Sequence, residues 1–479
     1  KMDDNVQLMN NLFKDDDTLV VRYVQNSKSN FKCALIYSDG VVKGPIINEN
    51  VIKPLMLADE NNLQSIDTIL NQVIQVNDTK KTGDLTQIIE SVTYGDTILF
   101  IDNSNEALIL NTKGFQTRAI AEPENEKILS GPREGFSDAL LTNLSLVRRK
   151  MRTNDLKMKY ITFGKRTATK ACICYLDSLV NKDILKELNR RLSEIDIDGM
   201  LDTNYITELI KDNKRSPFRS TGYTERPDVV VGRMLEGRIA IFLDGTPVVL
   251  TVPYLFLENF QSSEDYYLIY FYTSYSRMIR IISFLLTIAV PAIYVSMAAF
   301  HHEMFPTQLL INVAIERQSV PLPAAVEAFI MLIVFDILRE TGVRMPSSIG
   351  QALSIVGALV IGQAAVDAKL VAAPMIIVVA ITGITSLLVP KMNAPIIYMR
   401  FFLLLMASSF GFFGVLLGLA VIAIHILNLR SLGIPQIFFF SDVNYQHLKD
   451  TFFRGPWWKM QTRPRILTQG GNRMKVNKE

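Results

Sequence analysis

Long apolar runs dominate the pattern of hydrophobic and polar positions in the second part of the chain. Four stretches carry at most one formally charged residue each, at positions 281–300, 349–368, 370–389 and 401–427. A helix rises about 1.5 Å per residue, so about 20 residues cross the roughly 30 Å hydrocarbon core of a bilayer. Four such helices packed inside a soluble core would have no polar face to turn toward water. The pattern therefore predicts four membrane spans.

A fifth apolar stretch, residues 324–340, is shorter and less uniform than the other four. It contains Glu327 and Asp336, and prolines flank it on both sides. An acidic group at mid-bilayer is costly unless it faces a cavity or a partner. We therefore expect a re-entrant or interfacial helix here.

In the front half, short alternating apolar strands are separated by helical patterns such as residues 182–193, and two segments recur. Residues 95–104 match 237–246 at an offset of 142, and residues 32–39 match 170–177 at an offset of 138. Two matches in the same order at nearly one offset favour an internal duplication. We expect two tandem mixed α/β subdomains.

The predicted fold is thus a multi-domain membrane protein. Two mixed α/β cytosolic subdomains precede an all-α transmembrane domain of about four spans plus the re-entrant or interfacial helix. The predicted boundaries are 1–120 for the first subdomain, 121–276 for the second with its linker, 277–430 for the transmembrane domain and 431–479 for a basic cytosolic tail.

Composition and charge agree with this division. Hydrophobic residues make up 49% of the chain and the mean hydropathy is +0.20, which excludes intrinsic disorder and disfavours a wholly soluble enzyme. Residues 1–276 carry 33 Lys and Arg against 38 Asp and Glu, whereas residues 277–479 carry 17 against 9. Basic residues beside a span favour the cytoplasmic side, and no apolar export signal opens the sequence. We therefore expect both termini in the cytoplasm, which requires an even number of spans.

The sequence shows no catalytic or metal-binding pattern. Its front half has no histidine and no GxGxxG, GxxxxGK[ST], HExxH or GxSxG motif. Cys33, Cys172 and Cys174 form no CxxC motif, so we interpret them as buried reduced thiols. We expect neither an enzyme nor a cofactor.

A long ordered series of short motifs runs through the middle of the chain. The motifs include GPREGF at 131–136, TERPD at 224–228, DGTP at 244–247, PLP at 321–323, LRE at 338–340, RMP at 344–346 and VIGQAAV at 360–366. Over about residues 120–430 this series resembles the A subunit of the GerA-type spore germinant receptors of spore-forming bacteria. The sequence departs from the family pattern at His302, where the family has proline, and at Asp336, where it has glutamate.

This resemblance implies a nutrient-gated germination complex in the inner spore membrane. The A subunit would form an ion-conducting homo-oligomer, a transporter-like B subunit would supply the nutrient pocket, and a lipoprotein C subunit would lie outside. Nutrient binding would then release monovalent cations. The alternatives are a paralogue of the same fold that amplifies germination without sensing nutrients, and a non-conducting membrane scaffold that recruits germination partners.

The segment 349–368 is the candidate for ion passage. Val356, Val360, Gln363 and Asp367 follow helical spacings of three and four, so they share one face. Valine rings gate pores by dewetting and acidic rings favour cations. Small residues that let helices approach closely lie in the same segment, at Ser354, Gly357, Ala358 and Gly362. In the alternative interpretation, the small residues only seal a helix bundle and Asp367 pairs with Lys369.

A second charged cluster consists of Glu327, Asp336, Arg339, Glu340 and Arg344. Either it forms a cation-selecting vestibule or a contact to a partner subunit, or its charges simply pair along the helix, as Asp336 would with Arg339.

Two features near the end of the chain complete the candidate sites. His425 stands alone in an apolar run, and we interpret it as a packed or weakly hydrogen-bonded side chain. Trp457 and Trp458, beside Arg454 and Lys459, are typical of anchoring at the lipid headgroup layer. A nucleic-acid patch is the weaker interpretation, because the front half is acidic and shows no nucleic-acid-binding module.

Overall fold

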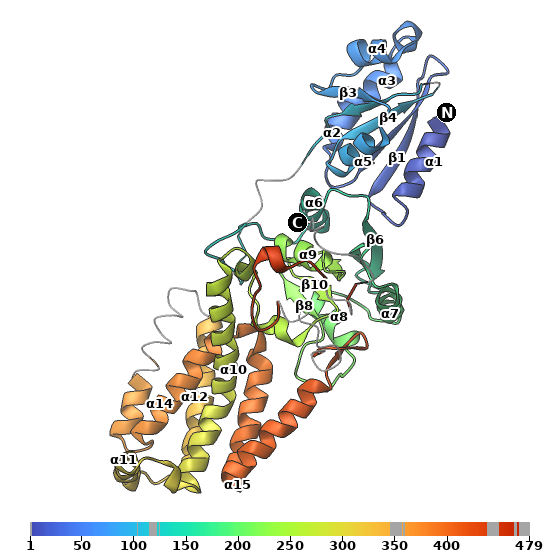
Figure 1. Cartoon of the computed structure of the whole chain (residues 1–479). Coiled ribbons are helices and arrows are strands. Elements are labelled where there is room, and N and C mark those ends of the chain that lie inside the picture. The colour runs from blue at the N-terminus through green and yellow to red at the C-terminus, as the bar shows by residue number, and fades with distance from the viewer. Residues whose placement is uncertain are drawn as a thin grey trace.

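The fold is known from a computed structural model, in which two sheets lie toward one end and a bundle of helices at the other (Figure 1). The structure describes residues 2–102, 104–114, 122–123, 125–344, 357, 360–437, 450–463 and 467–468.

The first sheet has five antiparallel strands in the order β1-β2-β4-β5-β3. They are β1 (Leu19–Gln25), β2 (Lys32–Ser38), β3 (Thr79–Thr82), β4 (Thr97–Ile101) and β5 (Ala107–Leu110). Alternation along β2 places Cys33 and Leu35 in one hydrophobic core, and Ala34 and Ile36 in the core on the opposite face. The sheet is therefore covered on both faces.

Helices cover both faces of the first sheet. The face of Ala34 packs against α1 (Met2–Leu12) and α5 (Leu85–Thr93). The other face packs against a run of short helical elements: α2 (Gly44–Ile46), η1 (Ile47–Ile52), α3 (Lys53–Leu57), η2 (Glu60–Leu63), α4 (Ile66–Thr68) and η3 (Ile69–Val73). Asp84 caps α5 by accepting a hydrogen bond from the Thr86 backbone N–H.

The second sheet repeats this plan, with the order β6-β7-β9-β10-β8. Its elements are β6 (Leu156–Phe163), β7 (Thr169–Leu176), β8 (Gly222–Thr224), β9 (Ile239–Leu243), β10 (Val249–Val252), α6 (Leu140–Lys150), α7 (Lys182–Ser193), α8 (Thr203–Leu209) and α9 (Pro227–Met234). The recurring segments 32–39 and 170–177 correspond to β2 and β7, and the recurring segments 95–104 and 237–246 contain β4 and β9. In the two strand orders, β2 and β7 hold equivalent places, and so do β4 and β9. All three cysteines are free and buried in these sheets, as predicted.

The helical part begins with α10 (Tyr270–Ala299) and continues through η6 (His302–Met304), α11 (Thr307–Gln318), α12 (Ala324–Arg344), α14 (Ala373–Leu387), η7 (Pro390–Met392) and α15 (Asn393–Leu427). Among the described residues, two helical segments are long and apolar enough to cross a membrane, 270–299 and 390–427, whereas α14 is shorter. The predicted segment 281–300 falls almost entirely in α10, and 370–389 contains α14. Half of 349–368 lies outside the described residues, although 360–367 is helical.

The stretch 401–427, predicted as one span, changes direction at Gly411. This residue has φ 60° and ψ −142°, so α15 consists of two helical arms that meet at the end of the bundle farthest from the sheets (Figure 1). Phe300 and His301, at the end of α10, lie against the bend. The apolar run is continuous in sequence, but the backbone reverses within it.

Both ends of α15 return to the second sheet. Lys391, just before the first arm, is 3.3 Å from the Glu126 carboxylate. After the second arm, the Ser431 hydroxyl in β11 (Arg430–Ser431) accepts a hydrogen bond of 2.9 Å from the Tyr254 backbone N–H. A short hairpin with β12 (Ile434–Pro435) follows, and the described tail continues with η8 (Trp457–Lys459). The described parts of the tail thus pack against the second sheet and α10.

Candidate functional site

The face predicted to line a pore is exposed where the structure describes it. Val360 is 57% exposed, and Gln363 and Asp367 are exposed as well. The Gln363 side-chain amide donates a hydrogen bond of 3.1 Å to the Asp367 carboxylate, so these two polar side chains are adjacent on the helix. Val356 lies outside the described residues. The described part of this face is therefore a polar stripe on the outer surface of an apolar bundle.

The predicted packing residues are described only in part. A Cβ at Gly357 would lie 3.0 Å from a methyl group of Leu338, whereas a Cβ at Gly362 would lie 3.6 Å from Ile376 of α14. The first distance is tight and the second is an ordinary contact. Ser354 and Ala358, the other two, lie outside the described residues. Within a single chain, Gly362 thus has room for one more methyl group.

The structure divides the charged cluster of α12 into a buried part and an exposed part. The Asp336 carboxylate lies 2.5 Å from the Arg400 guanidinium of α15 and 3.5 Å from Arg339. Glu340 and Arg344, one turn apart, form a pair of 2.7 Å in which both side chains are more than 60% exposed. The expected pairing of Asp336 with Arg339 is present, but Arg400 is the nearer partner and comes from another helix.

Glu327 is buried where three helices meet. Its side chain has 0% exposure; one carboxylate oxygen lies 3.4 Å from the Arg317 guanidinium of α11 and the other accepts a hydrogen bond of 3.1 Å from the Ala372 backbone N–H. Ala372 immediately precedes α14, so the carboxylate sits at the positive end of the helix dipole. This arrangement fixes the turn that leads from the helix 360–367 into α14.

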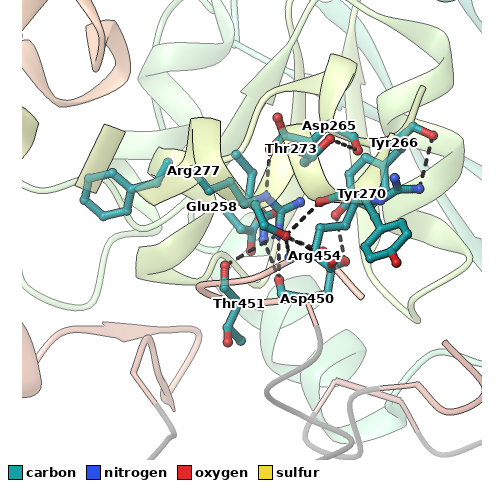
Figure 2. A network of polar contacts seen from close by, with 12 residues as sticks. Glu258, Asp265, Tyr266, Tyr270, Thr273, Arg277, Asp450, Thr451 and Arg454 are labelled. Atoms are coloured by element: carbon teal, nitrogen blue, oxygen red, sulfur yellow. Dashed lines mark hydrogen bonds and ion pairs between the residues drawn. The ribbon is translucent and has the colours of Figure 1, made fainter. Parts of the chain in front are cut away.

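An extended polar network lies at the junction between the second sheet, α10 and the tail (Figure 2). Arg277 of α10, 0% exposed, donates to Asp265 at 2.7 Å and to Asp450 of the tail at 2.8 Å. Arg280 lies one turn further along α10 and is 3.0 Å from the same Asp265 carboxylate. The tail thereby contacts the start of the first long apolar helix through a buried ion pair.

Further hydrogen bonds extend this junction on both sides. The Tyr266 hydroxyl donates to Asp450 at 2.8 Å, and burial together with that carboxylate raises the pKa of Tyr266. The Arg454 guanidinium of the tail donates to the Leu268 carbonyl at 2.8 Å. Toward the sheet, Arg238 pairs with the buried Glu258 carboxylate. A continuous series of polar contacts therefore joins the second sheet to α10 and the tail.

Three other predicted side chains have clear surroundings. His425 lies in the second arm of α15, where its Nε2 atom is 3.0 Å from the Ser216 hydroxyl and its ring packs 5.7 Å from that of Phe218. The interpretation of His425 as a packed, weakly hydrogen-bonded residue is confirmed. Trp457 and Trp458 lie beside Tyr266 and Tyr270, at the start of α10.

Sequence reasoning missed the arginines that balance the buried acids. Arg400 stands among apolar residues, and Arg317 lies in a helix without a clear amphipathic pattern. A lone arginine in an apolar run is itself a signal, because such a charge requires a partner. Among the described residues, no group of three His, Cys, Asp or Glu side chains is placed to hold a metal ion.

The described chain thus combines an α/β front part of two sheets with an apolar helix bundle that contains internal ion pairs, and a buried polar junction joins the two. The chain belongs to the Bacillus/Clostridium GerA spore germination protein family, whose model matches residues 7–466.

Individual relatives agree with this assignment. Spore germination protein KA of Bacillus subtilis is 40% identical over 440 residues, covering 91% of this chain and 81% of the relative. An uncharacterized membrane protein of the same organism, YfkQ, is 39% identical over 447 residues, 93% of this chain and 87% of the relative. Spore germination protein A1, also from Bacillus subtilis, is 33% identical over 450 residues, with 94% and 92% covered.

Among solved structures, the N-terminal domain of the A subunit of the Bacillus megaterium spore germinant receptor GerK3 is similar to this chain. The identity is 30% and the TM-score is 0.43, with 53% of this chain and 95% of that domain covered.

Proposed function

We propose that this chain is the A subunit of a nutrient germinant receptor and oligomerises into a ligand-gated cation channel of the inner spore membrane. A transporter-like B subunit and a lipoprotein C subunit would complete the receptor, and monovalent cations would be the permeant species. The names of the relatives support a role in germination, and none of those compared above is named for a catalytic activity.

One observation carries the channel proposal. Gln363 and Asp367 are exposed on the outside of an apolar helix bundle, beside the exposed Val360. In a single chain inserted in a bilayer this stripe would face lipid, which is costly for a carboxylate. In a ring of identical chains the stripe can face a shared, water-filled lumen. Valine would then narrow the lumen, and a ring of Asp367 carboxylates would favour cations.

The proposed topology follows from the direction of the helices. The start of α10 and both ends of α15 adjoin the second sheet, while the bend at Gly411 lies against the far end of α10. The two arms of α15 thus leave the sheet side and return to it. Both termini would then lie on the cytoplasmic side, as the basic residues near the apolar segments indicate. We also propose that the two sheets are tandem copies of one ancestral unit.

Cation flux from liposomes tests the channel. We expect Val360→Ala to raise the basal leak, because a smaller side chain widens an apolar constriction, and Asp367→Asn to lower the preference for cations over anions. Ile361→Ala is the matched control: Ile361 is the next residue, 39% exposed, and points about 100° away from Val360. It should leave both properties unchanged.

The alternatives predict different results. A non-conducting scaffold passes no ions in any variant, even when it is reconstituted with the B subunit and its nutrient, and that result would contradict the proposal. An amplifying paralogue conducts ions but does not respond to nutrient in any combination with a B subunit. Measuring flux with and without the B subunit therefore separates the three.

A further inference from the structure

Exposed aromatic side chains gather where the polar junction meets the apolar bundle. In the first turns of α10, Phe271, Tyr272 and Tyr275 are 71%, 61% and 65% exposed. In the tail, Phe453, Trp457 and Trp458 are 58%, 45% and 64% exposed. We call these six rings the aromatic collar.

Contacts between the tail and α10 place the six rings at one level of the molecule. The Ser274 hydroxyl and the Arg454 backbone exchange contacts of 3.2 Å, and the Trp458 ring packs edge-on against Tyr270 at 5.8 Å. The Trp457 ring lies 6.2 Å from Tyr266. The described tail segment 450–463 therefore runs beside the first turns of α10, and Figure 2 shows Asp450 and Arg454 next to this helix.

The length of α10 indicates the depth of this level in a bilayer. The helix has 30 residues and is therefore about 45 Å long, close to the roughly 40–45 Å of a bilayer with its headgroups. About 20 residues fill the hydrocarbon core, which leaves about ten for the interface. The first ten residues of α10 contain all of its collar rings.

The side chains around the collar fit the same depth. Further along α10 the exposed residues are aliphatic, such as Ile282, Leu285 and Leu286. At the level of the collar itself lie the charged residues of the junction, where Asp265 and Asp450 pair with Arg277. Tyrosine and tryptophan rings prefer the boundary between these two environments, because one end of each ring is apolar and the other is polar.

We propose that the aromatic collar is a membrane-contacting surface that holds the tail segment 450–463 in the lipid headgroup layer. The exposed Lys459, between Trp458 and the rest of the tail, would meet anionic headgroups there. The buried pair of Arg277 and Asp450 then lies just above the hydrocarbon core and joins this lipid-bound segment to α10. The inference rests on the proposed membrane crossing of α10, and it is independent of ion conduction.

The chain offers a direct probe of this surface, because its only two tryptophans are collar residues. The experiment uses the full-length protein in vesicles of phosphatidylcholine and phosphatidylglycerol in which part of the lipid carries bromine, a quencher of tryptophan emission. We expect bromine near the carbonyl end of the acyl chain to quench the tryptophan emission at least about twofold more strongly than bromine near the methyl end does. Trp457→Phe and Trp458→Phe assign the effect to each ring.

A matched control reports on the membrane crossing itself. In a chain with both tryptophans replaced by phenylalanine, Leu285→Trp places one indole about 15 Å further along α10 than Tyr275. Its emission should be quenched most strongly by bromine near the methyl end. The two probes should therefore give opposite results: bromine near the carbonyl end quenches the collar tryptophans more strongly, and bromine near the methyl end quenches the Leu285→Trp probe more strongly.

Each other outcome overturns the proposal in a recognisable way. If the Leu285→Trp probe is quenched by lipid and the collar is quenched only by aqueous acrylamide, the tail lies in water. If neither lipid nor acrylamide quenches the collar, another protein chain covers it. If lipid bromine quenches neither the collar tryptophans nor the Leu285→Trp probe, α10 does not cross the bilayer. The membrane part of the proposed function then fails together with the collar.

Discussion

The Asp336 carboxylate and the Arg400 guanidinium lie 2.5 Å apart and join α12 to the first arm of α15. Arg400 is 0% exposed, and its Nε and Nη1 atoms make no hydrogen bond within the described residues. The guanidinium therefore depends on one carboxylate for most of its electrostatic compensation. A buried charge that loses its partner costs far more than an exposed one.

We predict that Asp336→Asn destabilises the helical bundle by about 3 kcal/mol, because it leaves the Arg400 charge buried without its counter-charge. Asp336→Glu keeps the charge and should cost much less. The measurement is thermal unfolding of the purified protein in detergent. Combining Asp336→Asn with Arg400→Met should recover most of the loss, since the unpaired charge is then removed.

The exposed pair on the same helix provides the control. Glu340 and Arg344 are 2.7 Å apart, but both are largely exposed. Exposed pairs contribute about 1 kcal/mol or less, so Glu340→Gln should leave the unfolding temperature nearly unchanged. Equal losses in Asp336→Asn and Glu340→Gln would contradict the view that burial gives the Asp336 pair its importance.

A second prediction concerns Glu327 and the turn before α14. Glu327→Ala removes the acceptor of the Ala372 N–H, and a charge-assisted hydrogen bond of this kind is worth about 1.5–3 kcal/mol. We expect backbone amide exchange at residues 372, 373 and 375 to rise about tenfold or more. Glu327→Gln retains an acceptor oxygen and should show a smaller rise.

Amides in α7 serve as the internal reference for this experiment, because that helix belongs to the second sheet. A uniform rise across the whole chain would show general unfolding and would argue against a local role of Glu327. A rise limited to the turn would support the view that this carboxylate positions the end of the helix 360–367.

Local patterns predicted the α/β part of the fold well. The helical spacing of residues 182–193 corresponds to α7 in full, and the two recurring segments contain strands at equivalent places in their sheets. These features depend on alternation and amphipathic spacing, which operate over a few residues. Burial of Cys33, Cys172 and Cys174 follows from the same alternation.

The contacts between different helices could not be predicted from local spacing. The spacing of one turn predicts the pairing of Asp336 with Arg339, which is present, but the nearer partner Arg400 comes from a helix that only tertiary packing brings close. The junction between Arg277 and Asp450 has the same origin. The bend at Gly411 could not be predicted for another reason. In a continuous apolar run, nothing in the sequence distinguishes a glycine that bends the backbone from one that packs in a helix.

A third prediction concerns the Cys33 thiol in the first sheet. Burial raises the pKa of Cys33 to about 12, whereas an unfolded cysteine titrates near 9. Between about pH 9 and pH 12 the folded state thus retains a proton that the unfolded state has lost. The contribution of this thiol to the free energy of unfolding is therefore complete below about pH 9. It falls by about 1.4 kcal/mol per pH unit as pH rises from about 9 to about 12.

Alkylation with iodoacetamide at pH 9 checks this expectation. Mass spectrometry should find Cys33 unmodified in the native protein and fully modified in the protein unfolded by guanidinium. Rapid modification of Cys33 in the native protein would mean that the thiol is accessible, and the buried position between β1 and β4 would then be wrong.

The bend in α15 gives a fourth prediction, at Gly411. Its φ of 60° and ψ of −142° form a conformation that residues with a Cβ rarely adopt, and a Cβ there would lie 3.0 Å from the Phe300 side chain. Gly411→Ala should therefore destabilise the bundle by about 2 kcal/mol. Gly362→Ala is the opposite case: its helical backbone and a nearest contact of 3.6 Å accept a methyl group, and alanine favours the helix by up to about 1 kcal/mol. Thermal unfolding in detergent should thus show opposite signs for the same substitution at the two sites. If Gly411→Ala were as stable as Gly362→Ala, α15 would be a single continuous helix and its two arms would not return to the second sheet.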